Sequence, residues 1–191
     1  MLYGREGKFD SLEKNWASSG ARFVVIYGGR RAGKTKFLGE FAKGKKCVFF
    51  SAQRLNSFAN LRLFEKAVEA FSGTPEHFEK WKDAFARVAD FAKEERFLLA
   101  IDDFADLVFE DGEILKAFRA AFENEWRNTQ IFVAAACGRM YFTESEILAE
   151  NSAAAVRRPL IVKLDELDYF DAAKVLPKGV SARDKLRYYC C

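Results

Sequence analysis

The sequence predicts an α/β fold, in which a parallel sheet of five strands has helices on both faces and so forms three layers. Short apolar runs rich in β-branched and aromatic residues alternate with stretches whose apolar residues recur every three or four positions. Strands that are apolar throughout are typical of parallel sheets buried on both faces. A glycine-rich motif directly joins the first of these strands to a helix. The 191 residues are enough for one such domain.

The expected elements follow in order along the chain. Strands are expected at residues 22–27, 47–52, 97–101, 130–136 and 159–164. Helices are expected at residues 8–19, 35–43, 56–71, 76–95, 113–127, 143–150 and 168–176. Thr74 is expected to cap the helix at 76–95, and Thr143 with Glu146 is expected to form a capping box. Ser181 is expected to cap a last segment that runs to Cys191.

Composition excludes several classes of protein. Half of the residues are hydrophobic and 31% are charged, as in a globular protein, and the net charge of +3 is too small to indicate nucleic-acid binding by itself. The sequence has no run of eighteen apolar residues and no apolar signal core. Its cysteines lack the spacing of a zinc or disulfide site, which fits a reducing cytoplasm. Cys47 and Cys137 are expected to be small buried residues, and His77 an ordinary surface histidine.

The glycine-rich motif, Gly-Gly-Arg-Arg-Ala-Gly-Lys-Thr, matches G-x-x-x-x-G-K-[S/T], the phosphate-binding P-loop or Walker A motif. Gly28 and Gly33 are expected to adopt backbone angles that other residues resist, so that successive N–H groups point at an anion. The helix that follows adds its positive dipole end. Lys34 is expected to bind the β- and γ-phosphates, and Thr35 can hold Mg²⁺. The predicted nucleotide-binding residues are Gly28, Gly29, Arg30, Arg31, Ala32, Gly33, Lys34 and Thr35, with the two arginines free to point toward a partner.

Two carboxylates follow the third strand. Asp102 occupies the position of a Walker B residue, which holds Mg²⁺ directly or through water. Asp103 is expected to orient or activate the attacking water, although it is shorter than glutamate. The loop, this pair and residues 137–139 all fall at the carboxyl ends of predicted strands, where such sheets bind ligands. An acidic turn without a function remains the alternative for the pair.

Arginines are the other candidates for acting on the phosphates. Arg139 follows the fourth strand, where a polar sensor of the γ-phosphate would lie. Arg157 and Arg158 precede the fifth strand and could add charge. An arginine that stabilises the transition state of phosphoryl transfer can contribute about 10³–10⁵ in rate. For each of these arginines, a solvated surface position remains the alternative.

Several stretches resemble the archaeal-type ATPase family, which belongs to the signal-transduction ATPases (STAND class) within the AAA-like group of P-loop NTPases. The matching stretches cover nearly the whole chain in the family's order and are Tyr3–Glu6, Phe23–Thr35, Phe49–Gln53, Asn60–Phe64, Ile101–Phe104 and Leu164–Ala173. The resemblance implies binding and hydrolysis of ATP with Mg²⁺, and a sheet of ASCE-type strand order with the P-loop strand central. It further implies an ATPase domain at residues 1–180, followed at 181–191 by the start of a truncated winged-helix segment. A protein partner or a second copy is expected, and DNA only through a C-terminal region beyond this chain.

The sequence departs from the family pattern at several positions. Gly29 replaces a common arginine, Asp103 replaces glutamate, and Arg139 replaces a small hydroxyl residue. Residues 153–157 replace a Pro-Leu-Tyr-Gly-Arg motif and keep only Arg157. These changes are expected to affect hydrolysis more than binding. The functions left open are a Mg²⁺-dependent ATPase acting as a nucleotide switch, with Lys34, Asp103, Arg139 and Arg157 as catalytic residues, a binding module with little hydrolysis, and a small-molecule kinase.

Overall fold

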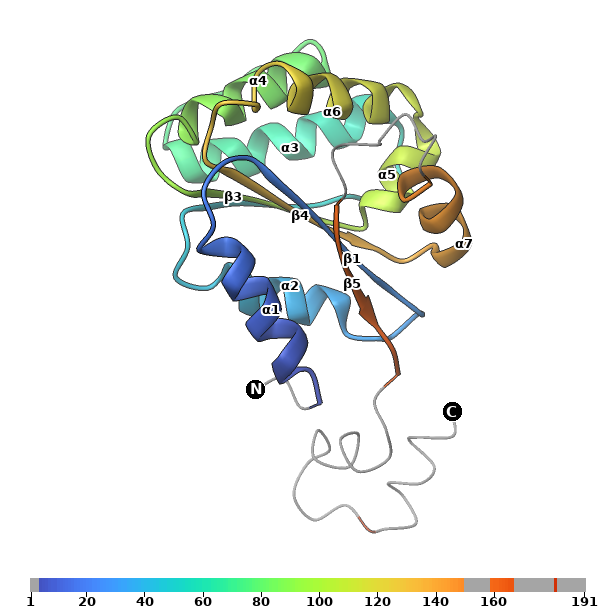
Figure 1. The fold of residues 1–191 in the computed structure, drawn as a ribbon. Helices are drawn as coiled ribbons and strands as arrows, with labels where there is room; N and C mark the ends of the chain where they lie inside the picture. The colour runs from blue at the N-terminus through green and yellow to red at the C-terminus, as the bar shows by residue number, and fades with distance from the viewer. Residues whose placement is uncertain (1–3, 150–158, 167–180, 182–191) are drawn as a thin grey trace.

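The computed structural model describes residues 4–149, 159–166 and 181. Its centre is a sheet of five parallel strands (Figure 1). The strands are β1 (Arg22–Gly28), β2 (Cys47–Ser51), β3 (Phe97–Asp102), β4 (Ile131–Cys137) and β5 (Leu160–Leu164). Their order across the sheet is β2-β3-β4-β1-β5. The predicted parallel α/β architecture and its five strands are therefore confirmed.

The strand order places β4, and not the P-loop strand, in the middle of the sheet. The expectation that β1 is central is therefore wrong, although β1 is an interior strand between β4 and β5. Every residue of β4 is buried, which explains its unbroken apolar sequence. Because β4 lies between β1 and β3, Tyr27 pairs with Cys137 and Ile101 with Ala135. The carboxyl ends of the three strands thus meet at one edge.

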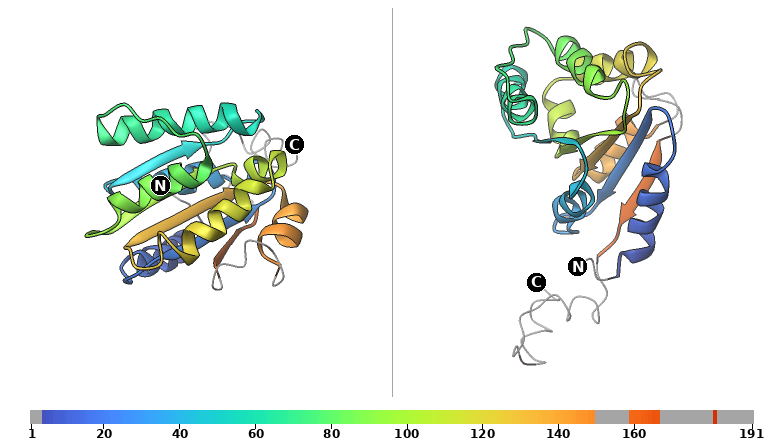
Figure 2. Two further views of the ribbon diagram at one scale, coloured as in Figure 1. Left: turned by 90° about the horizontal axis from the view of Figure 1, so that it is seen from above. Right: turned by 90° about the vertical axis from the view of Figure 1, so that its left-hand side faces the viewer.

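Helices cover both faces of the sheet. In Figure 1, α1 (Glu6–Trp16) and α2 (Lys34–Ala42) lie below it, and α3 (Ser57–Ser72), α4 (Trp81–Phe91) and α6 (Glu113–Glu123) lie above it. Seen from above, these last three helices lie over the strands (Figure 2). The short helices α5 (Phe104–Glu110) and α7 (Met140–Phe142) follow β3 and β4 directly, and a π-helical turn continues α7 over Thr143–Ile147. None of the described helices is long and apolar enough to cross a membrane.

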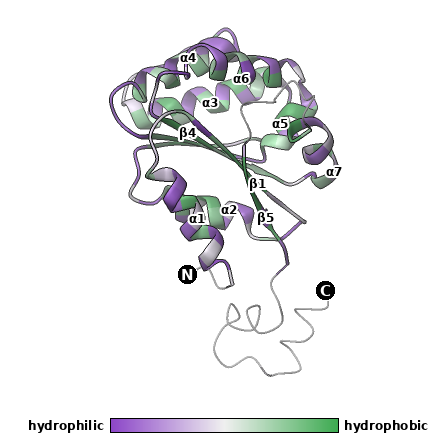
Figure 3. Ribbon diagram, viewed as in Figure 1, coloured by the Kyte–Doolittle hydropathy of each residue, from purple (hydrophilic) through white to green (hydrophobic). Residues whose placement is uncertain are grey.

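The numerous phenylalanines fill the core. The strands carry the strongest hydrophobic colour in Figure 3, and two apolar clusters pack against their two faces. On the α3–α6 side, Phe118 makes edge-on contacts with the rings of Phe23, Phe85 and Trp126. The indole of Trp126 is buried and its N–H donates to the carbonyl of Phe85 at 2.9 Å. Such ring pairs add to the stability gained from burial.

Several expectations for the helices are wrong. The helix expected at 76–95 begins at Trp81, and Thr74 is not its cap, because the Thr74 hydroxyl binds the hydroxyl of Ser72 at 3.1 Å. Thr143 forms no capping box, because the helical segment begins earlier at Met140 and buries the threonine. Helix α5 was not expected at all. The helix expected at 168–176 and the segment after Ser181 lie outside the described residues.

Candidate functional site

The glycine-rich loop connects β1 to α2 as its sequence predicts. Gly33 is the N-cap of α2 and has a left-handed backbone with a φ of +79°. Arg31 also has a positive φ, of 64°, which is uncommon for a residue with a side chain. The loop closes on itself through a hydrogen bond from the Ala32 N–H to the Gly29 carbonyl at 3.3 Å. A left-handed angle is thus found at Gly33 and Arg31.

Gly28 serves a different purpose from the one expected. It belongs to β1 and is not among the glycines with a positive φ. A Cβ atom at this position would lie 2.1 Å from the carbonyl oxygen of Leu164 in β5. Glycine is therefore required at the start of the loop because β5 passes too close for a side chain.

Lys34 lies over the loop. Its ammonium donates hydrogen bonds to the carbonyl oxygens of Gly28 at 3.1 Å and Gly29 at 2.8 Å. The next residue, Thr35, is exposed in the first turn of α2. An ammonium group and the N–H groups of a helix start suit an anion, because both present positive charge.

The carboxylates at the end of β3 are partly withdrawn from water. Asp102 is 3% exposed, and its Oδ1 accepts the backbone N–H of Asp103 at 3.2 Å. Asp103 has a left-handed φ of 54° and is the N-cap of α5. Burial raises the pKa of Asp103, as do the negative charges of Asp102 and Asp106, whereas Lys34 opposes this shift. The carboxylate oxygens of Asp102 are ligands of the kind that Mg²⁺ prefers.

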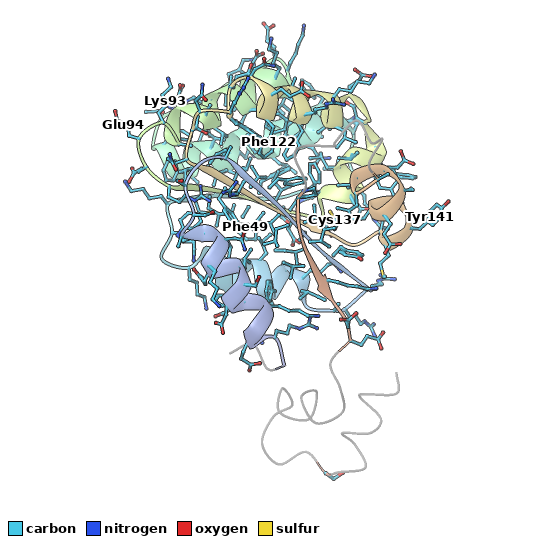
Figure 4. All side chains as sticks on the ribbon, viewed as in Figure 1. Phe49, Lys93, Glu94, Phe122, Cys137 and Tyr141 are labelled. Carbon is cyan, nitrogen blue, oxygen red and sulfur yellow. The ribbon has the colours of Figure 1, made fainter. Side chains whose placement is uncertain are left out.

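The end of β4 meets both features. A Cβ atom on Gly138 would lie 3.8 Å from Oδ1 of Asp103 and 4.0 Å from Nζ of Lys34. The ends of β1, β3 and β4 therefore bring the lysine and the acidic pair together, as their positions after predicted strands indicate. Cys137, just before Gly138, is buried, and burial raises the pKa of its thiol to about 12, so it packs as an inert core residue. Figure 4 shows Cys137 inside the fold and Tyr141 pointing outward from α7.

Arg139 turns toward α5. Its Nε pairs with Oδ1 of Asp106, and its guanidinium carbon lies 3.9 Å from the centre of the Phe109 ring. Nε of Arg54, in the loop after β2, lies 3.6 Å from the other oxygen of Asp106. Sequence reasoning missed Arg54, Asp106 and Phe109 because it missed α5. The spacing of Asp103 and Asp106, one helical turn apart, was the available signal.

The remaining predicted residues differ in how far they are exposed to solvent. Arg30 and Arg31 are exposed, as expected for side chains that point away from the loop, and Ala32 is buried. Arg157 and Arg158 lie outside the described residues. His77 is a surface residue whose side chain is largely exposed, as expected. Cys47 is half-buried, and burial raises the pKa of its thiol to about 12.

Known structures share this fold. A Walker-type ATPase of Pyrococcus abyssi superimposes with a TM-score of 0.66 at 15% identity, over 91% of this chain and 56% of its own. The ORC2 protein of Aeropyrum pernix, in ADPNP–ADP complexes, gives 0.67 at 16% identity, over 97% and 53%. Cdc6p of Pyrobaculum aerophilum gives 0.67 at 14% identity, over 98% and 50%. At these identities the likeness shows the α/β fold of P-loop ATPases and nothing finer.

Two sequence relatives and one family model also match the chain. An uncharacterized protein of Methanocaldococcus jannaschii is 24% identical over 94% of this chain, which spans 39% of that relative. An uncharacterized ATP-binding protein of the same organism is 35% identical over 46 residues, which are 24% of this chain and 78% of that protein. The chain thus spans about half, or less, of the longer proteins that it matches. A family model described as an ATPase domain predominantly from Archaea matches residues 2–186, and the chain belongs to this family of ATPase domains.

Proposed function

We propose that this chain is a Mg²⁺-dependent ATPase domain that binds ATP at Gly28–Thr35 and hydrolyses it to ADP, so that the bound nucleotide switches an attached module or partner. The observation that carries the proposal is the position of Lys34. Its ammonium lies over the phosphate loop and next to the point where Gly138 and Asp103 approach. Membership in a family of ATPase domains supports it.

The residues divide into two groups by their roles. The backbone N–H groups of the loop and Lys34 bind the phosphates. Thr35 and Asp102 hold Mg²⁺, which when bound neutralises charge on the phosphate oxygens. Two protein oxygen ligands are enough, because Mg²⁺ in such sites also binds phosphate and water.

Asp103 and the arginines are proposed to act on the terminal phosphate. Asp103, beside Lys34, is proposed to orient the attacking water and accept its proton. Arg139 and Arg157 are proposed to stabilise the charge that develops on the phosphate oxygens.

Single-turnover hydrolysis of ATP with Mg²⁺ tests this proposal. Lys34→Ala should abolish turnover and the thermal stabilisation by ATP, because it removes the ammonium over the loop. Lys36→Ala removes the same charge from an exposed position two residues later and should change neither. Equal turnover by the wild-type protein and Lys34→Ala would refute hydrolysis at this loop.

The second candidate is a binding module in which nucleotide orders the domain without being hydrolysed. The short side chain of Asp103 favours it, because aspartate reaches an attacking water less well than the glutamate that is common in the family. This candidate predicts that ATP and ADP stabilise the protein equally, with no turnover. Rapid production of ADP would exclude it.

The binding partners of this chain are also a matter of proposal. One solved structure with this fold, the Drosophila ORC, is bound to DNA, and this is a property of that complex. For the present chain, we propose that residues 1–180 form the ATPase domain, that it acts on a protein partner or a second copy, and that DNA is bound only through a region that follows it. A salt-dependent mobility shift of DNA by this chain alone would contradict the last point.

A further inference from the structure

Asp106 is the meeting point of two arginines that come from distant parts of the chain. Arg139 follows β4, and Arg54 lies in the loop after β2. The two contacts differ in distance and in the exposure of the arginine side chain. The side chain of Arg139 is 33% exposed and bonds Asp106 directly, whereas that of Arg54 is 76% exposed and lies 3.6 Å away. The ordered partner of Asp106 is therefore Arg139.

The guanidinium of Arg139 is held from two directions. Asp106, whose side chain is 15% exposed, binds its Nε, and the ring of Phe109 lies under its carbon at 3.9 Å. Phe109 itself contacts the ring of Phe142 edge-on at 5.5 Å, which ties α5 to α7. An arginine that is both ion-paired and stacked loses much of its freedom, unlike one on an open surface.

This arrangement lies directly beside the proposed site. Asp106 is one turn of helix beyond Asp103, and its N–H donates to the Asp103 carbonyl at 2.9 Å. Arg139 is adjacent in sequence to Gly138, the residue after β4 that approaches Lys34 and Asp103. Asp106 therefore holds the positive charge of Arg139 on α5, one helical turn from Asp103, and these residues together with Asp102 form what we call the rim.

We propose that Asp106 is a positioning residue that holds Arg139 at this rim, so that the guanidinium distinguishes ATP, which carries a terminal phosphate, from ADP, which does not. The inference rests on the proposed function and deepens it. Arg139 contributes its charge without first being ordered, because Asp106 and Phe109 have already ordered it. Asp106 acts only through Arg139 and is not itself a catalytic residue.

The test compares binding of a non-hydrolysable ATP analogue with binding of ADP, measured by calorimetry in the presence of Mg²⁺. Asp106→Asn keeps the shape of the side chain and removes the charge. We expect weaker binding of the analogue by about tenfold with ADP nearly unchanged, and kcat lower by about 10- to 100-fold, the range typical of losing a partner that orients a functional group. Asp106→Glu restores the carboxylate and should recover part of both.

A matched control separates positioning from the loss of an ion pair. Glu76 pairs with Arg87 in a setting of similar exposure, 10% and 33%, and neither residue belongs to the phosphate loop or to the ends of β3 and β4. Glu76→Gln should leave the ratio of analogue to ADP affinity and kcat unchanged. The thermal midpoint without nucleotide reports any general loss of stability in either variant.

The alternative outcomes each decide the question. An unchanged affinity ratio in Asp106→Asn, or equal weakening of both nucleotides, would overturn the positioning role. Tighter binding of the analogue would also overturn it, because it would mean that Asp106 holds Arg139 back. If the wild-type protein binds neither nucleotide, the proposed function itself fails, which is a different result from binding without discrimination.

Discussion

The phosphate loop and the acidic rim lie at the same edge of the sheet but are built in different ways. The loop, Gly28–Thr35, is one continuous stretch whose shape comes from its own backbone and from the passage of β5. The rim, which consists of Asp102, Asp103, Asp106 and Arg139, joins side chains from β3, α5 and the end of β4. A contiguous loop takes most of its geometry from residues that are neighbours in the chain. In a rim made of side chains from distant segments, a single substitution can remove one side-chain pair and leave the others in place.

The largest expected effect tests whether the rim controls hydrolysis and the loop controls binding. Asp102→Asn removes the charge proposed to hold Mg²⁺, so turnover with saturating ATP should fall by about 10²–10³-fold. Binding of ATP, measured without hydrolysis, should change far less. Asp83→Asn, at an exposed position of α4, is the control. If binding and turnover fall together, the proposed division between loop and rim is wrong.

The next effect is on stability and concerns the packing of β5 against the loop. Gly28→Ala places a Cβ 2.1 Å from the Leu164 carbonyl, and this overpacking should lower the free energy of unfolding by about 1–3 kcal/mol. Gly29→Ala, which has open space around it, should stay within about 0.5 kcal/mol of wild type. Urea unfolding of both variants measures the difference. Equal stabilities would show that β5 does not confine the loop.

A smaller effect concerns strain within the loop. Arg31 has a φ of 64°, which glycine adopts without cost, so Arg31→Gly should raise the free energy of unfolding by about 0.5–1 kcal/mol. Arg30 lacks a positive φ, so Arg30→Gly should only make the unfolded chain more flexible and lower stability. Thermal unfolding compares the two. A loss in both variants would mean that Arg31 makes a contact worth more than its strain.

The smallest effect concerns the ion pair of Arg87 and Glu76, which lies outside the rim and serves as a comparison for the pair of Arg139 and Asp106. Arg87 donates hydrogen bonds to Glu76, which lowers the pKa of Glu76. A carboxyl whose pKa is lowered by folding stabilises the protein above its unfolded pKa of about 4.3 and loses this effect as pH falls through the folded value. Glu76→Gln should therefore cost about 0.2–0.5 kcal/mol at neutral pH, and the difference from wild type should disappear in acid. A difference that persists in acid would have another cause than the charge of Glu76.

The sequence predicts the loop far better than the rim, for a physical reason. The strands and the loop depend on neighbours in the chain, so apolar runs and one motif were enough to locate them. Helix α5 was missed because it is only seven residues long, so its buried residues Phe104, Ala105, Leu107 and Val108 span too few turns to establish a helical period.

The pairs of the rim have no local signal. Arg139 and Asp106 are 33 residues apart, and nothing in either segment specifies the other. The misplaced cap has a similar cause, because Thr143 reads as a helix start but lies buried inside a helical segment that begins at Met140. Tertiary packing outweighed the local preference of a hydroxyl residue for a helix end.

Because Gly28 lies so close to the Leu164 carbonyl, the surroundings of the loop are complete only after β5 has been synthesised. The complete nucleotide motif leaves the ribosome early, but the strand that backs it is among the last of the described elements to be made. Translation at about 5–20 residues per second separates the two by on the order of ten seconds. During that interval, the nascent protein carries every residue of the motif but lacks β5, the strand that packs against Gly28.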